Sequence, residues 1–226
     1  MFKKILITAG PTREMLDPVR YLSNLSTGAM GYALAKAALS RGARVTLISG
    51  PTALLPPKGV KFIPVTSARD LEKACRRYFP KHDLLMMSAA VCDYEPHFRV
   101  RHKIPRSGKK QLILKSTPDI VAGLSRGKGK RCVIGFCLET RDWLRRAREK
   151  CRRKNLDGIV ANYLDSRHVP FGDRTIKTAV IDRQGRTRIL PCLKKSQLAR
   201  RLLLWAEWLA KKDSAALEKE YNKPPH

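Results

Sequence analysis

Short apolar runs that do not alternate with polar residues constrain the fold of this chain more than any other feature. A strand with one wet face alternates, so these runs indicate strands buried on both faces, as in a parallel sheet. Helical periodicity fills the intervals, which is typical of a Rossmann-like, doubly wound α/β fold with right-handed crossovers. The expected strands cover residues 4–8, 44–49, 62–65, 83–91, 132–137 and 158–162. The expected helices cover residues 28–40, 67–78 with Ser67 as the cap, 140–154 and 195–211, and another opens at Pro118.

Two segments depart from this alternation. Residues 178–181 and 187–190 predict an antiparallel hairpin, so the sheet is expected to be mostly parallel with a C-terminal antiparallel edge. Residues 92–115 are basic and interrupted by prolines, which predicts a long functional loop with at most a short hairpin ending at residues 111–114. We expect one domain over residues 1–211 and a flexible tail at 212–226.

The charge balance points to anionic partners. A net charge of +28 attracts nucleotides, phosphorylated metabolites or nucleic acids without choosing among them. No apolar run approaches about 18 residues, so no membrane-spanning helix is expected. The apolar start of the chain ends at Gly10 and Pro11, too early for a signal peptide. The six cysteines form no C-x-x-C pair, which indicates reduced, buried thiols in a cytoplasmic protein.

The first strand–turn–helix unit carries an anion-binding pattern. Gly10 ends the strand, and Ser26, Thr27 and Gly28 open the helix, where backbone amides and the helix dipole favour a phosphate. Ordinary capping of the helix by these hydroxyls is the alternative. The unit lacks the G-x-G-x-x-G spacing, and the second strand ends at residues 47–51 without an acid for a ribose, which disfavours a nicotinamide enzyme. No Walker A motif is present either.

The expected helix at residues 140–154 is strongly basic. Arg146, Lys150 and Lys154 recur every four residues and therefore share one face. Such a row would neutralise a triphosphate or a nucleic-acid backbone, and a solvated surface is the alternative. A zinc site at Cys92, His97 and His102 is a weaker alternative elsewhere, because the three are irregularly spaced in a loop.

Several segments, taken together and in order, resemble the phosphopantothenate–cysteine ligase (phosphopantothenoylcysteine synthetase) family over residues 3 to 210. No single segment would be specific, but the combination is. In many bacteria this ligase is fused behind a flavin-containing decarboxylase domain. The segments resemble the ligase part and not that domain, so we expect a stand-alone ligase of the bacterial, CTP-dependent type. The matching segments are TAGPTRE at 8–14, DPVRY at 17–21, SN at 23–24, STGAMG at 26–31, AAVCDY at 89–94, KI at 103–104, PDI at 118–120, GFCLET at 135–140 and RKNLD at 153–157.

The resemblance implies an activity with defined substrates. Such ligases join 4′-phosphopantothenate to L-cysteine with CTP and Mg²⁺, through an acyl-cytidylate and release of pyrophosphate. Catalysis of this kind is mainly positioning and charge neutralisation. The resemblance also implies a homodimer in which the active site is completed across the subunit interface. A nucleic-acid-binding protein on a Rossmann-like fold is the main alternative from another class, although no nucleic-acid-binding motif appears and no specific nucleic acid is expected.

Carried over to matching positions, the resemblance implies a set of site residues. Asn24 would hold the phosphopantothenoyl group and the acyl-nucleotide, and Lys103 would be the catalytic lysine at the reacting phosphate. The metal ligands stay unassigned. The implied nucleotide-binding residues are Ser26, Thr27, Gly28, Met87, Ser88, Ala89, Asp93, Lys103, Pro118, Asp119, Ile120, Val121, Phe136, Lys150 and Lys154. The chain departs from the family pattern at Ala29, Pro105, Arg106, Thr117, Cys137 and Leu138.

Overall fold

One eight-stranded sheet organises the chain in the order β12-β11-β10-β9-β6-β1-β4-β5. The structure is a computed structural model that describes residues 1–165 and 175–211. The tail expected at 212–226 lies outside the described residues. The six strands from β10 to β5 are parallel, and β11 and β12 add an antiparallel hairpin at one edge. The strands are β1 (Lys4–Ala9), β4 (Arg44–Ser49), β5 (Lys61–Pro64), β6 (Leu84–Met87), β9 (Cys132–Glu139), β10 (Gly158–Tyr163), β11 (Ile176–Asp182) and β12 (Thr187–Leu193).

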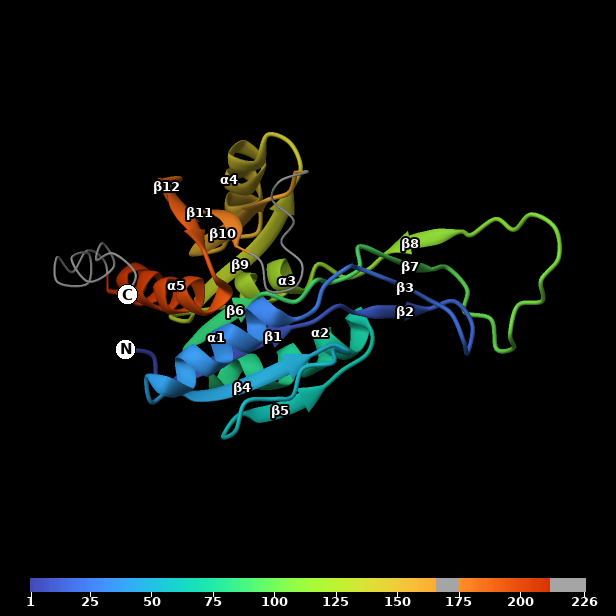
Figure 1. The fold of residues 1–226 in the computed structure, drawn as a ribbon, viewed down its shortest axis with the longest axis horizontal. Coiled ribbons are helices and arrows are strands. Elements are labelled where there is room, and N and C mark those ends of the chain that lie inside the picture. Colours follow the sequence, from blue (N-terminus) through green and yellow to red (C-terminus); the bar gives the residue numbers. More distant parts are fainter. Residues whose placement is uncertain (166–174, 212–226) are drawn as a thin grey trace.

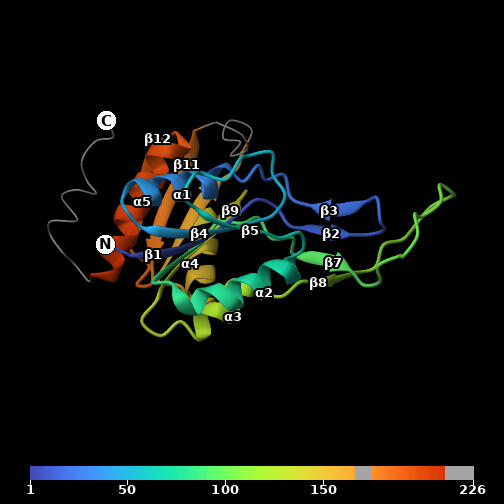
Figure 2. The same ribbon diagram turned by 90° about the horizontal axis from the view of Figure 1, so that it is seen from below.

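Helices cover both faces of this sheet (Figure 2). On one face, α1 (Ala29–Ser40) and α5 (Lys195–Ala210) close a core with the apolar side chains of the central strands. The other face carries α2 (Ala68–Tyr78), the short turn η1 (Phe79–Lys81), α3 (Ile120–Arg126) and α4 (Trp143–Arg153). The doubly wound, mostly parallel α/β fold is therefore confirmed. In the described part of the chain, no helix has the length and apolarity needed to cross a bilayer.

The strand order fixes where a ligand is expected. From β1 the chain moves outward through β4 and β5, then returns past β1 and continues through β6, β9 and β10. The order reverses between β1 and β6, which are hydrogen-bonded neighbours. In open α/β sheets, ligands bind outside the carboxyl ends of the strands at such a switch point.

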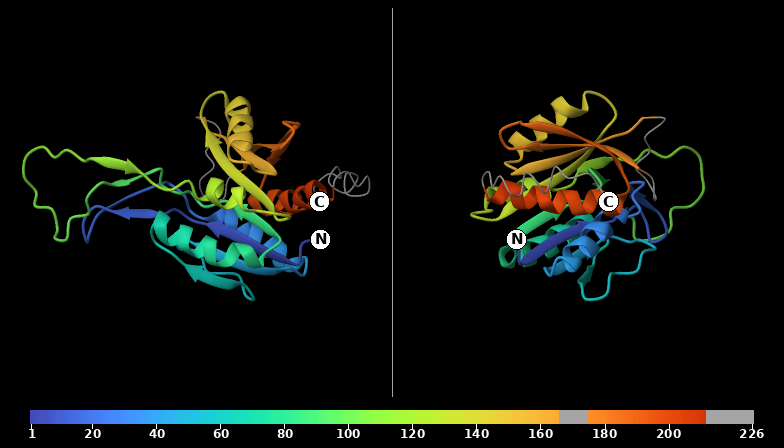
Figure 3. Two further views of the ribbon diagram at one scale, coloured as in Figure 1. Left: turned by 180° about the vertical axis from the view of Figure 1, so that it is seen from behind. Right: turned by 60° about the vertical axis from the view of Figure 1, so that its left-hand side comes forward.

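An arm extends from the carboxyl edge of the sheet, at the opposite end from the N-terminus (Figures 1 and 3). We define the arm as the hairpin of β2 (Arg13–Met15) and β3 (Tyr21–Ser23) together with residues 94–116, which contain β7 (Tyr94–Pro96) and β8 (Leu114–Ser116). Backbone hydrogen bonds join the two parts of the arm, as from Val100 N to the carbonyl of Leu16 at 3.0 Å.

Several boundaries differ from the sequence expectations. The strand expected at 83–91 ends at Met87, because the following residues turn toward the arm. Pro118 does not open a helix: Asp119 caps α3, which begins at Ile120. The helix expected at Thr140 begins at Trp143, because Asp142 has a left-handed backbone with φ 48°. The loop expected at 92–115, with a short hairpin ending at 111–114, contains β7 and the start of β8, which runs to Ser116. The β2–β3 hairpin was not expected.

Candidate functional site

The carboxyl ends of β1 and β6 are joined through Thr8. Its hydroxyl accepts the amide of Ala89 at 3.1 Å and donates to the sulfur of Met87 at 3.3 Å. The hydroxyl of Ser88 donates to the Thr8 carbonyl at 2.6 Å. The predicted nucleotide-binding residues Met87, Ser88 and Ala89 therefore lie directly at the switch point, held in a fixed arrangement.

Glycines allow three segments of the chain to approach one another closely beside residues 87–89. Gly10 has φ 72°, and a Cβ there would lie 2.8 Å from the carbonyl oxygen of Gly50. Gly28 has φ 78°, and its Cβ would lie 2.7 Å from a methyl group of Thr52. At Gly31, a Cβ would lie 2.4 Å from that of Ala9, so α1 packs closely on β1. Only backbone fits these approaches, which is the role that glycines have in Rossmann phosphate loops.

The N-terminus of α1 faces the switch point without a side-chain cap. Gly28 occupies the capping position and has no side chain to offer. The hydroxyls of Ser26 and Thr27 accept the amides of Gly28 and Ala29 at 3.3 and 3.5 Å, which are long contacts. The helix therefore presents amides and a positive dipole end where an anion would be stabilised. The predicted residues 26–28 are together at this point.

Asn24 lies on the other side of the same site. Its side-chain amide donates to the carbonyls of Ala90 and Val91 at 3.1 and 2.9 Å. Its backbone carbonyl accepts the amide of Ser26 at 2.8 Å. These bonds connect the arm hairpin, the end of β6 and the start of α1. Because both N–H groups of the amide are used, the side-chain oxygen is the group left for a ligand.

The segment before α3 is tied to the segment after β6. Thr117 donates its hydroxyl to the carbonyl of Cys92 at 2.6 Å and its amide to the carbonyl of Asp93 at 3.0 Å. This places the exposed Asp93 beside Pro118 and the start of α3. Within that start, Asp119 is exposed, Ile120 is buried and Val121 is half-buried.

The basic row on α4 is confirmed as one face, and it meets carboxylates. Arg146 and Lys150 each contact the buried Glu139, at the end of β9, at 2.6 Å. Lys154 contacts Asp119 at 3.1 Å. Burial opposes ionisation of Glu139, but the hydrogen bonds from Lys150 and Arg146 outweigh it and hold its pKa below the usual value. The carboxylates therefore orient the row and balance part of its charge.

Phe136 and Cys137 complete the side of the site formed by β9. Phe136 is half-buried against the core that α1 and α5 cover. Cys137 faces the opposite layer, and burial raises the pKa of its thiol to about 12. A thiol of that pKa stays protonated near neutral pH, so it is not a nucleophile in the resting site.

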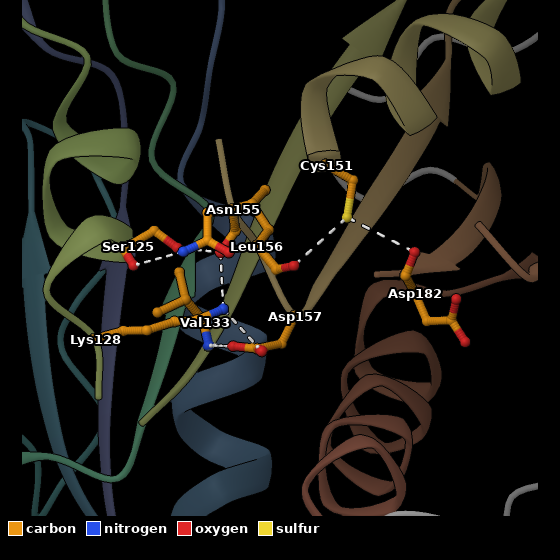
Figure 4. Close-up of polar contacts among 8 residues, drawn as sticks. All are labelled: Ser125, Lys128, Val133, Cys151, Asn155, Leu156, Asp157 and Asp182. Carbon is orange, nitrogen blue, oxygen red and sulfur yellow. Dashed lines mark hydrogen bonds and ion pairs between the residues drawn. The ribbon is translucent and has the colours of Figure 1, made fainter. Parts of the chain in front are cut away.

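Two residues of the RKNLD segment stabilise the fold instead of facing a ligand (Figure 4). Asn155 has a left-handed backbone, and its carbonyl accepts the Ser125 hydroxyl at 2.5 Å and the Lys128 ammonium at 2.7 Å. Asp157 accepts the same ammonium at 2.8 Å and the amide of Val133 at 2.8 Å. The network joins α3, β9 and the start of β10. Lys154, in the same segment, contacts Asp119, one of the predicted nucleotide-binding residues.

The structure does not bring Lys103 to the other predicted residues within one chain. Lys103 is exposed on the arm, next to Ile104, whose amide donates to Asp17 at 3.1 Å. Ile104 also accepts Arg20 at 3.2 Å, so this part of the loop lies at the turn of the β2–β3 hairpin. That turn lies far from α1, and the loop between β7 and β8 extends beyond it (Figure 1).

Sequence reasoning missed residues that hold the site in shape. Glu139, Thr8 and Asp17 are buried polar groups, and each is hydrogen-bonded to a residue that was predicted to function or to its neighbour. All three lie within the resembling segments, which was a usable signal. Among the described residues, no three His, Cys, Asp or Glu side chains gather as metal ligands. The described cysteines form no disulfide; Cys92 and Cys137 are half-buried and Cys192 is exposed, so the expectation of buried thiols holds for only part of the set.

Comparison with known proteins identifies relatives over most of the chain. The family model of the DNA/pantothenate metabolism flavoprotein C-terminal domain matches residues 1–208. The coenzyme A biosynthesis bifunctional protein CoaBC of Bacillus subtilis is 43% identical over 203 residues, which are 89% of this chain and 50% of that protein. CoaBC of Escherichia coli (strain K12) is 41% identical over 204 residues, 88% of this chain and 50% of that protein. The chain therefore spans about half the length of these curated relatives.

Solved structures show the same fold. The crystal structure of the C-terminal domain of CoaBC superposes with a TM-score of 0.79 at 38% identity, covering 93% of this chain and 97% of that one. A Cab2 variant in complex with phosphopantothenate-cysteine shares the fold, with a TM-score of 0.75 at 17% identity over 92% of this chain and 88% of that one. With a family model matched over nearly its whole described length, the chain belongs to the DNA/pantothenate metabolism flavoprotein C-terminal domain family.

Proposed function

We propose that this chain is a phosphopantothenate–cysteine ligase that works in coenzyme A biosynthesis through an acyl-cytidylate. Its substrates would be 4′-phosphopantothenate, L-cysteine and CTP. The observation that carries the proposal is the glycine-lined N-terminus of α1, which faces the switch point beside an anchored Asn24. The relatives named for coenzyme A biosynthesis support the same assignment.

The nucleotide fits the groups that the site offers. Its phosphates would lie at the N-terminus of α1, where amides and the helix dipole stabilise negative charge. The base and ribose would lie between residues 87–89 and the start of α3, with Phe136 packing beside them. Lys150 and Lys154 would turn their side chains from Glu139 and Asp119 toward the phosphates. Each ammonium group would then exchange one anionic partner for another.

Asn24 would select the part of the acid that it contacts. Since its two N–H groups are donated to Ala90 and Val91, only its oxygen remains, and that oxygen accepts a hydrogen bond. It would therefore contact a donor of the pantothenoyl group, a hydroxyl or an amide N–H, and leave the reacting carboxylate to cationic groups. An amide also adds no charge beside an anionic substrate.

The reaction balances in two steps. A carboxylate oxygen attacks the α-phosphorus of CTP, the bond to the β-phosphate oxygen breaks, and pyrophosphate leaves. The amine of cysteine then attacks the acyl carbon, CMP leaves with the former carboxylate oxygen, and the amine loses a proton. Positioning the anionic reactants and offsetting their charge is the main task of the chain.

Mg²⁺ is the metal that the resemblance implies. It commonly binds nucleotide phosphates with one or two carboxylates instead of a full protein cage. Asp93, an exposed carboxylate beside the start of α3, fits that mode. When bound, the ion would neutralise part of the triphosphate charge.

The position of Lys103 supports a homodimer. Eight of the fourteen exposed large apolar side chains among the described residues lie on the arm: Val19, Tyr21, Tyr94, Phe98, Val100, Leu112, Ile113 and Leu114. Such a concentration marks an interaction surface. In our proposal the arm packs on a second copy and carries Lys103 to that copy's site, where its charge would offset the reacting phosphate. The reduced thiols fit the cytoplasmic setting that we propose.

Pyrophosphate release tests the proposal. Purified protein is incubated with Mg²⁺ and either CTP or ATP, with and without phosphopantothenate and cysteine. We expect pyrophosphate that depends on phosphopantothenate and CTP, and CMP once cysteine is added. Pyrophosphate release without the acid would indicate a simple nucleotide hydrolase, and no release with either nucleotide would refute the ligase.

A further inference from the structure

A basic hollow of about 780 Å³ lies at the amino edge of the sheet, opposite the arm and the proposed site. Six cationic side chains and one carboxylate line it, together with the buried ring of His82. Burial lowers the pKa of His82, and both of its ring nitrogens are engaged, with the Tyr78 carbonyl at 2.7 Å and the Thr46 hydroxyl at 2.9 Å. The cations are Lys3, Lys4, Arg44, Lys81, Lys130 and Arg131.

The register of the sheet arranges these cations in a row. Lys4 pairs with Arg44 across β1 and β4, and Asp83 and Arg131 stand immediately before the paired residues that open β6 and β9. Strands lie about 4.8 Å apart, so the four strand starts of β4, β1, β6 and β9 span about 14 Å. A compact anion needs no such length, whereas an extended polyanion does.

The row is available for a ligand. Among the described residues, Lys3, Lys4, Arg44, Lys81 and Lys130 are exposed and form no ion pair. The one carboxylate of the hollow, Asp83, is already engaged with the amides of Lys3 and Lys4 at 3.1 and 2.9 Å.

Arg131 is fixed in direction. Its guanidinium donates to the carbonyls of Lys128 and Pro80 at 3.1 and 3.0 Å and lies 5.6 Å from the ring of Phe79. Phe79 itself is buried, and Phe2, the aromatic side chain other than His82 that lines the hollow, is half-buried against the core. Bases would therefore have little aromatic surface on which to stack, and the row would contact mainly phosphates.

We propose that this row binds the phosphodiester backbone of single-stranded nucleic acid without sequence preference. The function goes beyond the ligase reaction and uses the opposite edge of the sheet. A flexible single strand can follow a concave row of cations, and successive phosphates would displace condensed counterions. Binding through contacts of this kind depends steeply on salt, with a slope of log K against log salt of about −0.7 per phosphate contact for single strands.

Fluorescence anisotropy with a labelled oligouridylate of about 20 nucleotides tests the proposal at several KCl concentrations. The variant combines Lys4→Gln, Arg44→Gln, Lys81→Gln and Lys130→Gln. The matched control combines Lys36→Gln, Lys73→Gln, Lys194→Gln and Arg200→Gln, which remove the same charge from exposed helix positions and the cap of α5. Circular dichroism and thermal unfolding report whether each protein is folded.

We expect the row variant to bind at least about tenfold more weakly in 0.1 M KCl, with a salt slope smaller by about three, and the control to change less than about twofold. Equal weakening of both variants would overturn the proposal, because binding would then follow net charge. Long-chain polyphosphate that binds through the row while oligouridylate does not would also overturn it. Neither outcome depends on whether the chain is a ligase.

Discussion

At the scale of single residues, Asn24 is the most informative position. The site needs its amide for two hydrogen bonds to Ala90 and Val91 and its oxygen for the substrate. In Asn24→Asp, an ionised carboxylate would face both carbonyls without a hydrogen to donate and would repel an anionic acid. We expect kcat/KM for phosphopantothenate to fall about 10- to 100-fold, which corresponds to about 1.4–2.7 kcal/mol.

A neutral variant separates the two causes. Asn24→Leu removes the hydrogen bonds and adds no charge. If repulsion dominates, kcat/KM for phosphopantothenate should therefore fall less in Asn24→Leu than in Asn24→Asp. Steady-state kinetics with CTP in excess give both values. Unchanged kinetics in a folded Asn24→Asp protein would contradict the placement of the substrate beside this residue.

Lys128 is a buried cation that holds elements together. It joins the Asn155 carbonyl and Asp157 (Figure 4). In Lys128→Met, the Asp157 carboxylate loses its partner in a mostly buried position, which typically costs about 3–5 kcal/mol in the free energy of unfolding. We expect about 2–4 kcal/mol here, because Asp157 keeps the amide of Val133. Urea unfolding measures the difference, and Lys130→Met, on an exposed lysine nearby, should change by less than about 0.5 kcal/mol.

At the scale of elements, the arm depends on one carboxylate. Asp17 is buried and accepts the amides of Val19, Arg20 and Ile104 at 2.7, 2.8 and 3.1 Å. Burial opposes its ionisation, but these bonds and the Arg20 charge outweigh it and hold its pKa below the usual value. Ionised Asp17 therefore stabilises the arm above the usual aspartate pKa, and this contribution is lost as the pH falls through the lowered value.

Hydrogen exchange at the amides of Val19 and Ile104, corrected for intrinsic rates, tests this role. Protection should be constant from pH 7 to 5 and should fall in acid below the usual pKa, which is about 3.9 for aspartate. Asp17→Asn should weaken the protection at all pH values and remove its pH dependence. The control Asp142→Asn, at an exposed helix start, should leave both the protection and its pH dependence unchanged. Protection that survives in Asp17→Asn would show that the arm is held by other contacts.

The elements differ in how far the sequence predicts them. The six parallel strands and four of the helices follow from apolar runs and periodicity, since their side chains are buried on a regular repeat. The arm strands have three residues each and little apolar pattern, so no periodicity indicates them. Their positions depend on contacts between residues that are distant in the chain, such as the hydrogen bond between Asp17 and Ile104.

The candidate site was predicted to the same uneven extent. Spacing alone placed Arg146, Lys150 and Lys154 on one face, and the structure confirms it. The contact between that face and Glu139 requires β9 to pair with β10 and α4 to pack beside the end of β9. Residue spacing alone does not predict this packing. The position of Lys103 depends on the arm, and its catalytic role stays a prediction.

At the scale of the whole molecule, two inactive variants can test whether the arm serves a second copy. If Lys103 completes the partner's site, a dimer of one Asn24→Asp chain and one Lys103→Gln chain has one intact site and one site with both changes. Each variant alone should lose most of its turnover. Unfolded together and refolded as an equal mixture, they should regain about one quarter of wild-type activity. No recovery, with heterodimers verified by mass spectrometry, would place Lys103 in the site of its own chain or outside any site.

The fate of the carboxylate oxygens tests the central claim most directly. Phosphopantothenate labelled with ¹⁸O in its carboxylate is converted with CTP and cysteine, and the nucleotide product is analysed by mass spectrometry. An acyl-cytidylate requires one labelled oxygen in the phosphate of CMP, with unlabelled pyrophosphate. Label in inorganic phosphate, with CDP as the nucleotide product, would show an acyl-phosphate and contradict the mechanism proposed for this site.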